Sequence, residues 1–256
     1  MTLSGTITNT SGGTVTLSNQ GTGSGSVTIS GVIKNSDYPI SVTQNSATSK
    51  LTLSGANTYS GTTTISAGTL ALTVATAVGG SASIVIMAGA TFDVSAVTLS
   101  IKGSAPVQTL GCGSTSGTAI VNATGRTLTL ASGALLAFQA DGTSVCKMVV
   151  TNNLTLNNNV VTVNVNGSAL AQGTYRLLEC TGTLTGVAWP DAVMTGMPLS
   201  TGCLGFIQTT AGTSGYMELV VLKAPVFTGG SYDGFDTRSF LNSEIPTKKG
   251  TLVSFF

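Results

Sequence analysis

The sequence predicts an all-β protein whose short strands stack in parallel as a β-solenoid. Charged residues make up 7% of the chain and hydrophobic residues 41%, whereas a typical soluble domain is about 25% charged. With a mean hydropathy of +0.39, the chain has enough apolar material for a core and is not a polar disordered segment. Its 33 glycines separate short alternations of apolar residues with Thr or Ser, and helical periodicity is nearly absent.

A strand-like motif recurs about every twelve residues in the first part of the chain. It occurs at residues 15–18, 27–30, 40–43, 51–54 and 63–66, and the alternation places apolar side chains on one face and hydroxyls on the other. An antiparallel sandwich or barrel fits the same spacing, but such folds usually carry more hairpin turns and charged outer residues. In a solenoid, identical charges would stack and repel, so the scarcity of charge favours the solenoid.

Weaker motifs extend the predicted solenoid to about Leu222. They lie at residues 83–86, 96–99, 126–130, 154–156, 161–165, 173–178 and 216–221. We therefore expect a solenoid domain over residues 1–222 and a separate, non-repetitive C-terminal tail over residues 223–256.

Residues 51–72, LTLSGANTYSGTTTISAGTLAL, resemble the autotransporter-associated β-strand repeat of bacterial passenger domains. The order of an LTLSG strand, an NTYSG turn, a TTIS strand and an AGTL segment carries this resemblance. Residues 27–33 fit a strand one coil upstream, whereas residues 34–50 depart from the family pattern and are expected to form a loop excursion. The resemblance implies a right-handed parallel β-helix that is exported and displayed outside the cell.

The tail differs from the solenoid in composition. Residues 223–256 carry seven charged residues, and six aromatic residues there are candidates for assembly contacts: Phe227, Tyr232, Phe235, Phe240, Phe255 and Phe256. The tail has three interpretations: a linker or the start of a following domain, a cap over the last coil, or a segment that docks on a neighbouring molecule. In the third, the solenoid ends and the tail join copies into a homo-oligomer or filament.

The sequence offers no set of residues suited to catalysis. It contains no histidine, the commonest general base and a frequent metal ligand. Only Asp233 and Asp236 lie close together among the acidic residues, and a calcium loop needs further oxygen ligands. We expect no cofactor and no metal. The ten basic residues are scattered, which argues against nucleic acid as a partner. A carbohydrate-active β-helix enzyme is the least favoured alternative.

Four cysteines, Cys112, Cys146, Cys180 and Cys203, permit two disulfides in three connectivities. We favour the pairs Cys112–Cys146 and Cys180–Cys203, because stacked coils bring nearby segments into register. The alternative is four buried thiols in the core.

Trp189, the only tryptophan, and Asp191 lie in a segment that departs from the Ser, Thr and Gly pattern. An exposed Trp can stack on a sugar ring, so this segment is the candidate ligand loop of an adhesin. The alternative is a Trp that anchors an end cap. Asn57, in the turn of the repeat, is predicted to be an internal residue whose amide satisfies the backbone.

No stretch of about 18 apolar residues is present, so we expect no membrane-spanning helix. The start of the chain, MTLSGTITNTSGG, has no secretory signal pattern. Composition nevertheless favours an exported protein, located outside the cell or on the bacterial surface. The expected function is that of a non-catalytic structural rod that self-assembles into fibres or surface arrays. The alternative is an adhesin domain that binds glycan or protein on a host or cell surface.

Overall fold

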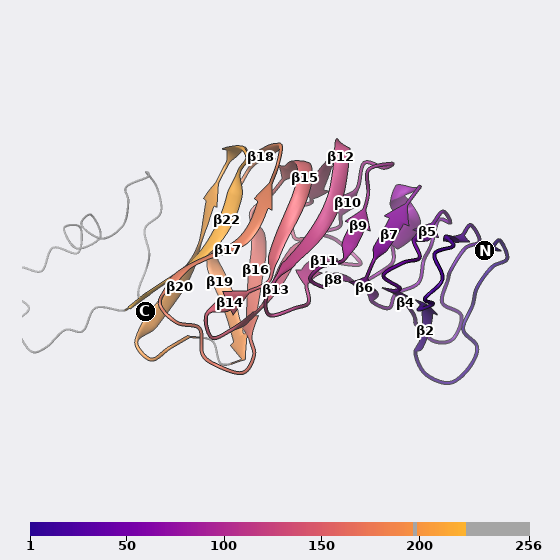
Figure 1. Cartoon of the computed structure of the whole chain (residues 1–256), viewed down its shortest axis with the longest axis horizontal. Coiled ribbons are helices and arrows are strands. Elements are labelled where there is room, and N and C mark those ends of the chain that lie inside the picture. The colour runs from indigo at the N-terminus through magenta and orange to yellow at the C-terminus, as the bar shows by residue number, and fades with distance from the viewer. Residues whose placement is uncertain (197–198, 224–256) are drawn as a thin grey trace, which may run out of the picture. The chain divides into compact units, whose positions relative to one another are not determined.

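The computed structural model describes residues 1–196 and 199–223, which form a parallel β-solenoid of about seven turns. The strands stack one above another along the long axis of these residues (Figure 1). Successive turns pair in parallel, as where Leu51 lies opposite Leu70 and Leu70 opposite Phe92. Each regular turn gives one strand to each of two sheets, so the sequence repeat of about twelve residues corresponds to half a turn. The predicted solenoid is confirmed.

The first sheet has thirteen strands and the second has nine. The thirteen-stranded sheet contains β1 (Thr2–Leu3), β3 (Val27–Ile29), β5 (Leu51–Leu53), β7 (Thr69–Leu72), β9 (Thr91–Asp93), β10 (Ser100–Ile101), β12 (Thr118–Leu130), β15 (Lys147–Thr155), β17 (Gly173–Cys180), β18 (Thr183–Thr185), β20 (Cys203–Thr210), β21 (Gly212–Thr213) and β22 (Tyr216–Lys223). The nine-stranded sheet contains β2 (Val15–Asn19), β4 (Ile40–Asn45), β6 (Thr63–Ala67), β8 (Ser83–Ile86), β11 (Thr109–Cys112), β13 (Leu135–Asp141), β14 (Ser144–Val145), β16 (Asn159–Val165) and β19 (Ala188–Gly196). The helical element in the described residues is one short 3-10 turn, η1 (Ala75–Val78).

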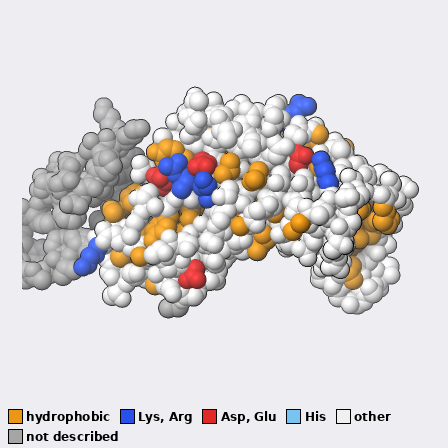
Figure 2. Space-filling model, viewed as in Figure 1, with side chains coloured by type: hydrophobic (Ala, Val, Ile, Leu, Met, Phe, Trp, Pro, Cys, Tyr) orange, Lys and Arg blue, Asp and Glu red, His pale blue; other side chains and the backbone are white. Residues whose placement is uncertain are grey.

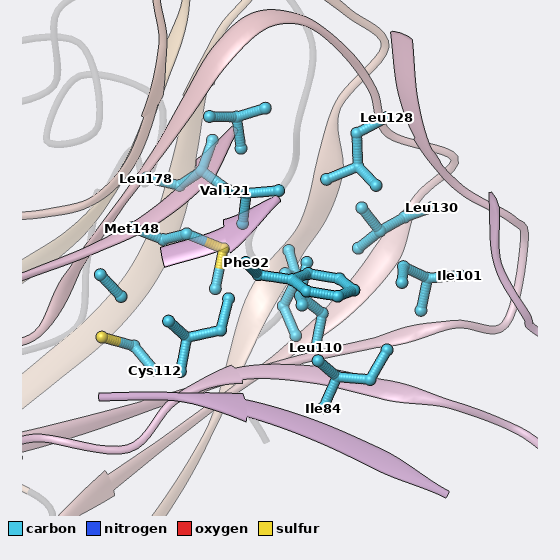
Figure 3. Close-up of a cluster of buried hydrophobic side chains, with 14 of the residues drawn as sticks. Ile84, Phe92, Ile101, Leu110, Cys112, Val121, Leu128, Leu130, Met148 and Leu178 are labelled. Atoms are coloured by element: carbon cyan, nitrogen blue, oxygen red, sulfur yellow. The ribbon is translucent and has the colours of Figure 1, made fainter. Parts of the chain in front are cut away.

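The core lies between the two sheets and is built from ladders of inward-facing residues. Alternate strand positions point inward, and parallel pairing stacks equivalent positions of successive turns. One ladder of the first sheet runs through Leu51, Leu70, Phe92, Val121, Val150 and Cys180. The facing ladder of the second sheet runs through Val42, Thr63, Ile84, Leu110, Leu136 and Val161. Figure 3 shows the Phe92 ring between the two sheets, near Leu110 and Ile84.

Buried polar side chains in the solenoid are hydrogen-bonded. The Asn57 Oδ1 atom accepts a bond from the Ile33 backbone N–H at 2.9 Å, and its Nδ2 donates to the Ala77 carbonyl at 2.8 Å. The amide thus bridges successive turns, which confirms the prediction for Asn57. Throughout the described residues, every buried side-chain nitrogen and oxygen has a hydrogen-bond partner. This is expected, because a buried polar group without a partner lowers the stability of the fold.

The C-terminal end of the solenoid is closed by antiparallel strands. β22 pairs antiparallel with β17 on one side and with β20 on the other, and β20 also lies beside β19 of the second sheet. The sequence predicted that residues 216–221 would form another parallel strand, so this part of the prediction is wrong. In the first sheet, parallel stacking ends with the pairing of β17 and β18 on β15.

Three other segments differ from the sequence-based expectation. Residues 96–99 form no strand; they belong to a turn before β10, although Val97 and Leu99 are buried. Residues 34–50 are not simply a loop excursion, because they contain β4, which pairs with β2 and β6 in the second sheet. The segment around Trp189 is the strand β19 and not a loop. The predicted tail from residue 224 onward, with its six aromatic residues, lies outside the described residues.

Candidate functional site

The densest group of charges in the described residues lies on the outer side of β15, β17 and β22. Lys147 Nζ is 2.8 Å from Glu179 Oε1, and Arg176 Nε is 3.0 Å from Glu218 Oε1. Arg176 Nη1 lies a further 3.9 Å from Glu179 Oε2 and joins the two pairs. Figure 2 shows charged side chains gathered over β17 and β22, while most of the remaining surface is uncharged. We call these four residues the ionic cluster.

The ionic cluster includes an aromatic contact. The Arg176 guanidinium carbon lies 3.5 Å from the centroid of the Tyr216 ring, a cation–π geometry. Arg176 and Glu218 face each other directly in the antiparallel register of β17 and β22. Such cross-strand pairs stabilise one register over its neighbours. The cluster therefore connects the last parallel strands to the closing strand β22.

An open hollow of about 240 Å³ adjoins the ionic cluster. Its lining residues are Arg176, Glu179, Cys180, Thr181 and Ser214. These groups are largely engaged with each other or with backbone: the Thr181 hydroxyl accepts a bond from the Asn152 N–H at 2.8 Å. Burial raises the pKa of the Cys180 thiol, so the thiol stays protonated at neutral pH and is a poor nucleophile.

No metal centre is formed within residues 1–196 and 199–223, where no three His, Cys, Asp or Glu side chains converge. Asp233 and Asp236, the acidic pair noted in the sequence, lie outside the described residues. The charged side chains of the ionic cluster pair with one another across neighbouring strands.

Cys112 and Cys146 are joined by a disulfide with a Cα–Cα distance of 5.9 Å. Cys112 is the last residue of β11 in the second sheet. Cys146 lies between β14 of the second sheet and β15 of the first. The bond therefore joins two successive turns of the solenoid at the point where each leaves the second sheet. The bridge closes a loop of 34 residues, which corresponds to about 3–4 kcal/mol of stabilisation in the chain-entropy description. Structural disulfides are typical of exported proteins.

Cys180 and Cys203, the second predicted pair, are free thiols. Both flank β22 but at opposite ends, because Glu179 lies opposite Tyr216 and Cys203 lies opposite Lys223. Seven residues along a strand separate them by about 23 Å, far beyond the reach of a disulfide. Cys180 instead fills the last position of an inward apolar ladder. Proximity in sequence failed here because β17 and β20 run in the same direction on either side of β22, and Cys180 ends β17 whereas Cys203 begins β20.

Trp189 lies on the edge strand β19, with 48% of its surface exposed. Between β16 and β19 the pairing shifts, from Asn159 opposite Ala188 to Val161 opposite Ala192. Two extra residues of β19 therefore form a bulge that contains Trp189, Pro190 and Asp191. Both Trp189 and Asp191 are exposed in this bulge. The indole is available to a ligand.

The ionic cluster was missed by the sequence-based reasoning. Its signal was nevertheless present, because Arg176 and Glu218 each interrupt a predicted strand in a chain that is nearly free of charge.

The described residues also include no helix long and apolar enough to cross a membrane.

Residues 48–72 match the family described as the passenger-associated-transport-repeat. These residues cover β5 and β6, which form one regular turn of the solenoid, and β7, the first strand of the next turn. This match and the β-solenoid fit an autotransporter passenger-like repeat protein. No curated protein matches it significantly. The passenger-like chain thus combines a matched repeat with further turns of the same solenoid on both sides.

Proposed function

We propose that this passenger-like chain is a non-catalytic structural rod, exported and held outside a bacterial cell. The observation that carries the proposal is the transport repeat at residues 48–72, embedded in a continuous solenoid core. The low charge of the chain and the Cys112–Cys146 disulfide support a protein that works outside the cell. The charged groups of the ionic cluster pair with one another and hold strands, which fits a structural role.

Association between rods is part of this proposal. The sequence suggested stacking at the solenoid ends, but at the C-terminal end the first sheet continues as two antiparallel strands, β22 and then β20, and not as another parallel turn. The bulge and Pro190 on β19 are also devices that protect edge strands from pairing with another chain. These features favour association along the sides of the rod over stacking at this end.

Surface labelling of intact cells tests the export proposal. Antibodies against the solenoid are expected to label intact cells of the source organism, and external protease is expected to remove that label. A cytoplasmic protein of known location serves as the control for cell lysis. Label that appears only after the cells are broken would refute the proposed location.

An adhesin is the second candidate function, favoured by the half-exposed Trp189 beside Asp191. Indole rings stack on the apolar faces of sugars, and a carboxylate accepts bonds from sugar hydroxyls. Glycan-array binding that is lost in Trp189→Ala, and kept in Val187→Ala as a matched exposed position, would support this function. Equal binding by wild type and Trp189→Ala would remove Trp189 from consideration.

A further inference from the structure

Three side chains of the edge strand β19 form a row that faces away from the core. Ala188 is buried, and Ala192 packs against the core cluster. Because successive side chains of a strand point to opposite faces, the odd-numbered positions beside them face outward. Trp189, Asp191 and Val193 occupy these positions, and all three are exposed. An indole, a carboxylate and an isopropyl group thus follow one another along the outer side of the strand.

The spacing of the indole and the carboxylate suits a single sugar ring. Trp189 and Asp191 are alternate residues of β19, so their Cα atoms lie about 7 Å apart. A pyranose ring that lies on the indole would therefore bring its substituents within reach of the carboxylate. Both residues also lie in the bulge, where β19 is not paired with β16. Bulges commonly turn side chains toward a functional direction.

Protection of the edge strand does not account for the whole of this row. Pro190 and the charge of Asp191 both hinder pairing with another chain. The indole adds nothing to that protection, because a small polar side chain would hinder pairing equally well. Trp189 is nevertheless the only tryptophan of the chain, and 48% of its surface is exposed. An exposed indole of this kind is typical of a binding surface.

Charge selects the class of ligand. Asp191 takes part in none of the ion pairs of the described residues, and the strands of its sheet contain no Lys or Arg. The other acid of these strands, Asp141, accepts a bond from the Ser168 backbone N–H at 2.8 Å. A carboxylate without a cationic partner repels anions and attracts ammonium groups, and the face of an indole also attracts cations.

From these features we infer that Trp189 and Asp191 bind a glycan with free amino groups, such as a glucosamine oligomer. The indole stacks on the apolar face of one sugar ring, and the Asp191 carboxylate pairs with an ammonium group of the same glycan. An N-acetylated sugar lacks this positive charge and a uronic acid has the opposite charge, so both bind more weakly. The inference rests on the adhesin function, the second candidate above, and deepens it by naming the chemical class of the ligand.

Titration of the full chain with three oligosaccharides of equal length tests the inference. The probes are oligomers of glucosamine, N-acetylglucosamine and galacturonic acid, at about pH 5.5, where free sugar amines are protonated. Intrinsic fluorescence reports on Trp189 alone, because the chain has no other tryptophan. The glucosamine oligomer is expected to bind about five- to tenfold more tightly than the N-acetylated one at low salt. This preference should decrease in about 1 M salt.

Two variants separate the roles of the charge and the ring. Asp191→Asn keeps the shape of the side chain and removes its charge, so the preference for the glucosamine oligomer is expected to fall to about twofold or less. Trp189→Ala is expected to lose binding of both the glucosamine and the N-acetylated oligomers, measured by calorimetry because this variant has no tryptophan. Both side chains are exposed, so thermal unfolding of the variants should match that of the wild type.

Matched controls test whether any surface change has the same effect. Asp141→Asn removes the same charge from the same sheet, and Val187→Ala truncates another exposed side chain. Asp141 follows Ala140, which the register places level with Gly196. Gly196 lies five residues after Asp191, or about 17 Å along the strand. Both control variants are therefore expected to bind the glucosamine oligomer as the wild type does.

The outcomes distinguish failure of the ligand class from failure of the adhesin function. Equal binding of the glucosamine and N-acetylated oligomers through Trp189, or tighter binding of the galacturonic acid oligomer, would overturn the ligand class and leave an adhesin standing. No binding of these oligomers or of any glycan on an array would refute both. A preference that Asp141→Asn weakens as much as Asp191→Asn does would overturn the inference, because it would reflect the charge of the whole chain.

Discussion

At the scale of single residues, the solenoid tolerates polar groups inside its core only where their partners are fixed. Thr63 occupies an inward ladder position between Val42 and Ile84. Its hydroxyl lies 2.6 Å from the Tyr59 hydroxyl and donates to Ser81 Oγ at 2.9 Å. All three residues are buried. The chain therefore replaces one apolar contact in the ladder with a closed hydroxyl network.

Burial of Tyr59 makes stability depend on pH in the alkaline range. Desolvation raises the pKa of Tyr59 to about 12, against a value of 10.0 in the unfolded chain, although its bond to Thr63 opposes the shift. Above pH 10 the unfolded chain loses this proton and the folded chain keeps it, so the free energy of unfolding falls as pH rises. The loss should reach about 2–3 kcal/mol near pH 12.

Urea unfolding between pH 9 and pH 12, read by circular dichroism, measures this effect. Tyr59→Phe lacks the ionisable group and keeps the ring, so it is the matched control. It should be less stable than the wild type at neutral pH by about 1 kcal/mol, through loss of the hydroxyl bond. The difference in stability should shrink as pH rises and change sign before pH 12, and a constant difference would show that Tyr59 does not contribute.

The ionic cluster gives a second prediction at this scale. Arg176 and Glu218 are partly exposed, with side-chain exposures of 36% and 15%, so solvent screening limits their coupling to about 0.5–1 kcal/mol. A double-mutant cycle with Arg176→Met and Glu218→Gln should yield this coupling energy. It should decrease in 1 M salt, because salt screens exposed charges. A coupling energy near zero would mean that backbone pairing alone fixes β22 on β17.

At the scale of elements, glycine corners set how closely successive turns approach. A Cβ atom added to Gly55 would lie 2.3 Å from the carbonyl oxygen of Gly31, and one added to Gly31 would lie 1.9 Å from that of Gly5. These three glycines form one stacked corner after β1, β3 and β5. Gly5 lies at the outer end of this stack, and a Cβ added there meets nothing within 4 Å.

Substitutions at this corner should therefore differ by position. Gly55→Ala is expected to lower the free energy of unfolding by about 2–4 kcal/mol, because backbone must move to relieve the contact. Gly5→Ala makes the same chemical change at the same corner in open space and should alter it by less than about 0.5 kcal/mol. Denaturant midpoints of the two variants provide the comparison. Similar losses at both positions would contradict a steric cause.

Much of this element-level structure could be predicted from the sequence. The strands at residues 51–53 and 83–86 were visible because apolar residues alternate with Thr, Ser or Val between glycines. The direction of β22 was not visible, since YMELVV alternates equally well in a parallel or an antiparallel strand. The cross-strand pair of the antiparallel register, Arg176 with Glu218, becomes apparent only when the chain is folded. The Trp189 bulge was missed for another reason, because the departure of this segment from the Ser, Thr and Gly pattern suggested a loop.

At the scale of the whole described solenoid, the two ends differ. The terminal strands at both ends pair on one side only, but β20 pairs with β22 over eight residues at the C-terminal end, whereas β1 pairs with β3 over two at the N-terminal end. The apolar side chains Leu3, Ile7 and Leu17 at that end are only partly buried. Stability in a solenoid is carried by contacts between neighbouring turns, so a turn with one neighbour is the weakest.

Hydrogen exchange should follow this difference. Amide protons of β2 and β4 are expected to exchange faster than those of β15 and β16, because the N-terminal turn can open without disturbing the rest. Exchange followed by mass spectrometry on peptic fragments resolves these segments. Uniform protection from β2 to β16 would show that the solenoid opens only as a single unit.

The pairing of each turn with only its two neighbours makes the solenoid a molecular ruler. Every added turn of about 20–30 residues lengthens it by about 4.8 Å. Because the ionic cluster and the closing strands lie at one end, duplication or loss of an internal turn leaves that end intact. The length of the solenoid can thus change in steps of one turn.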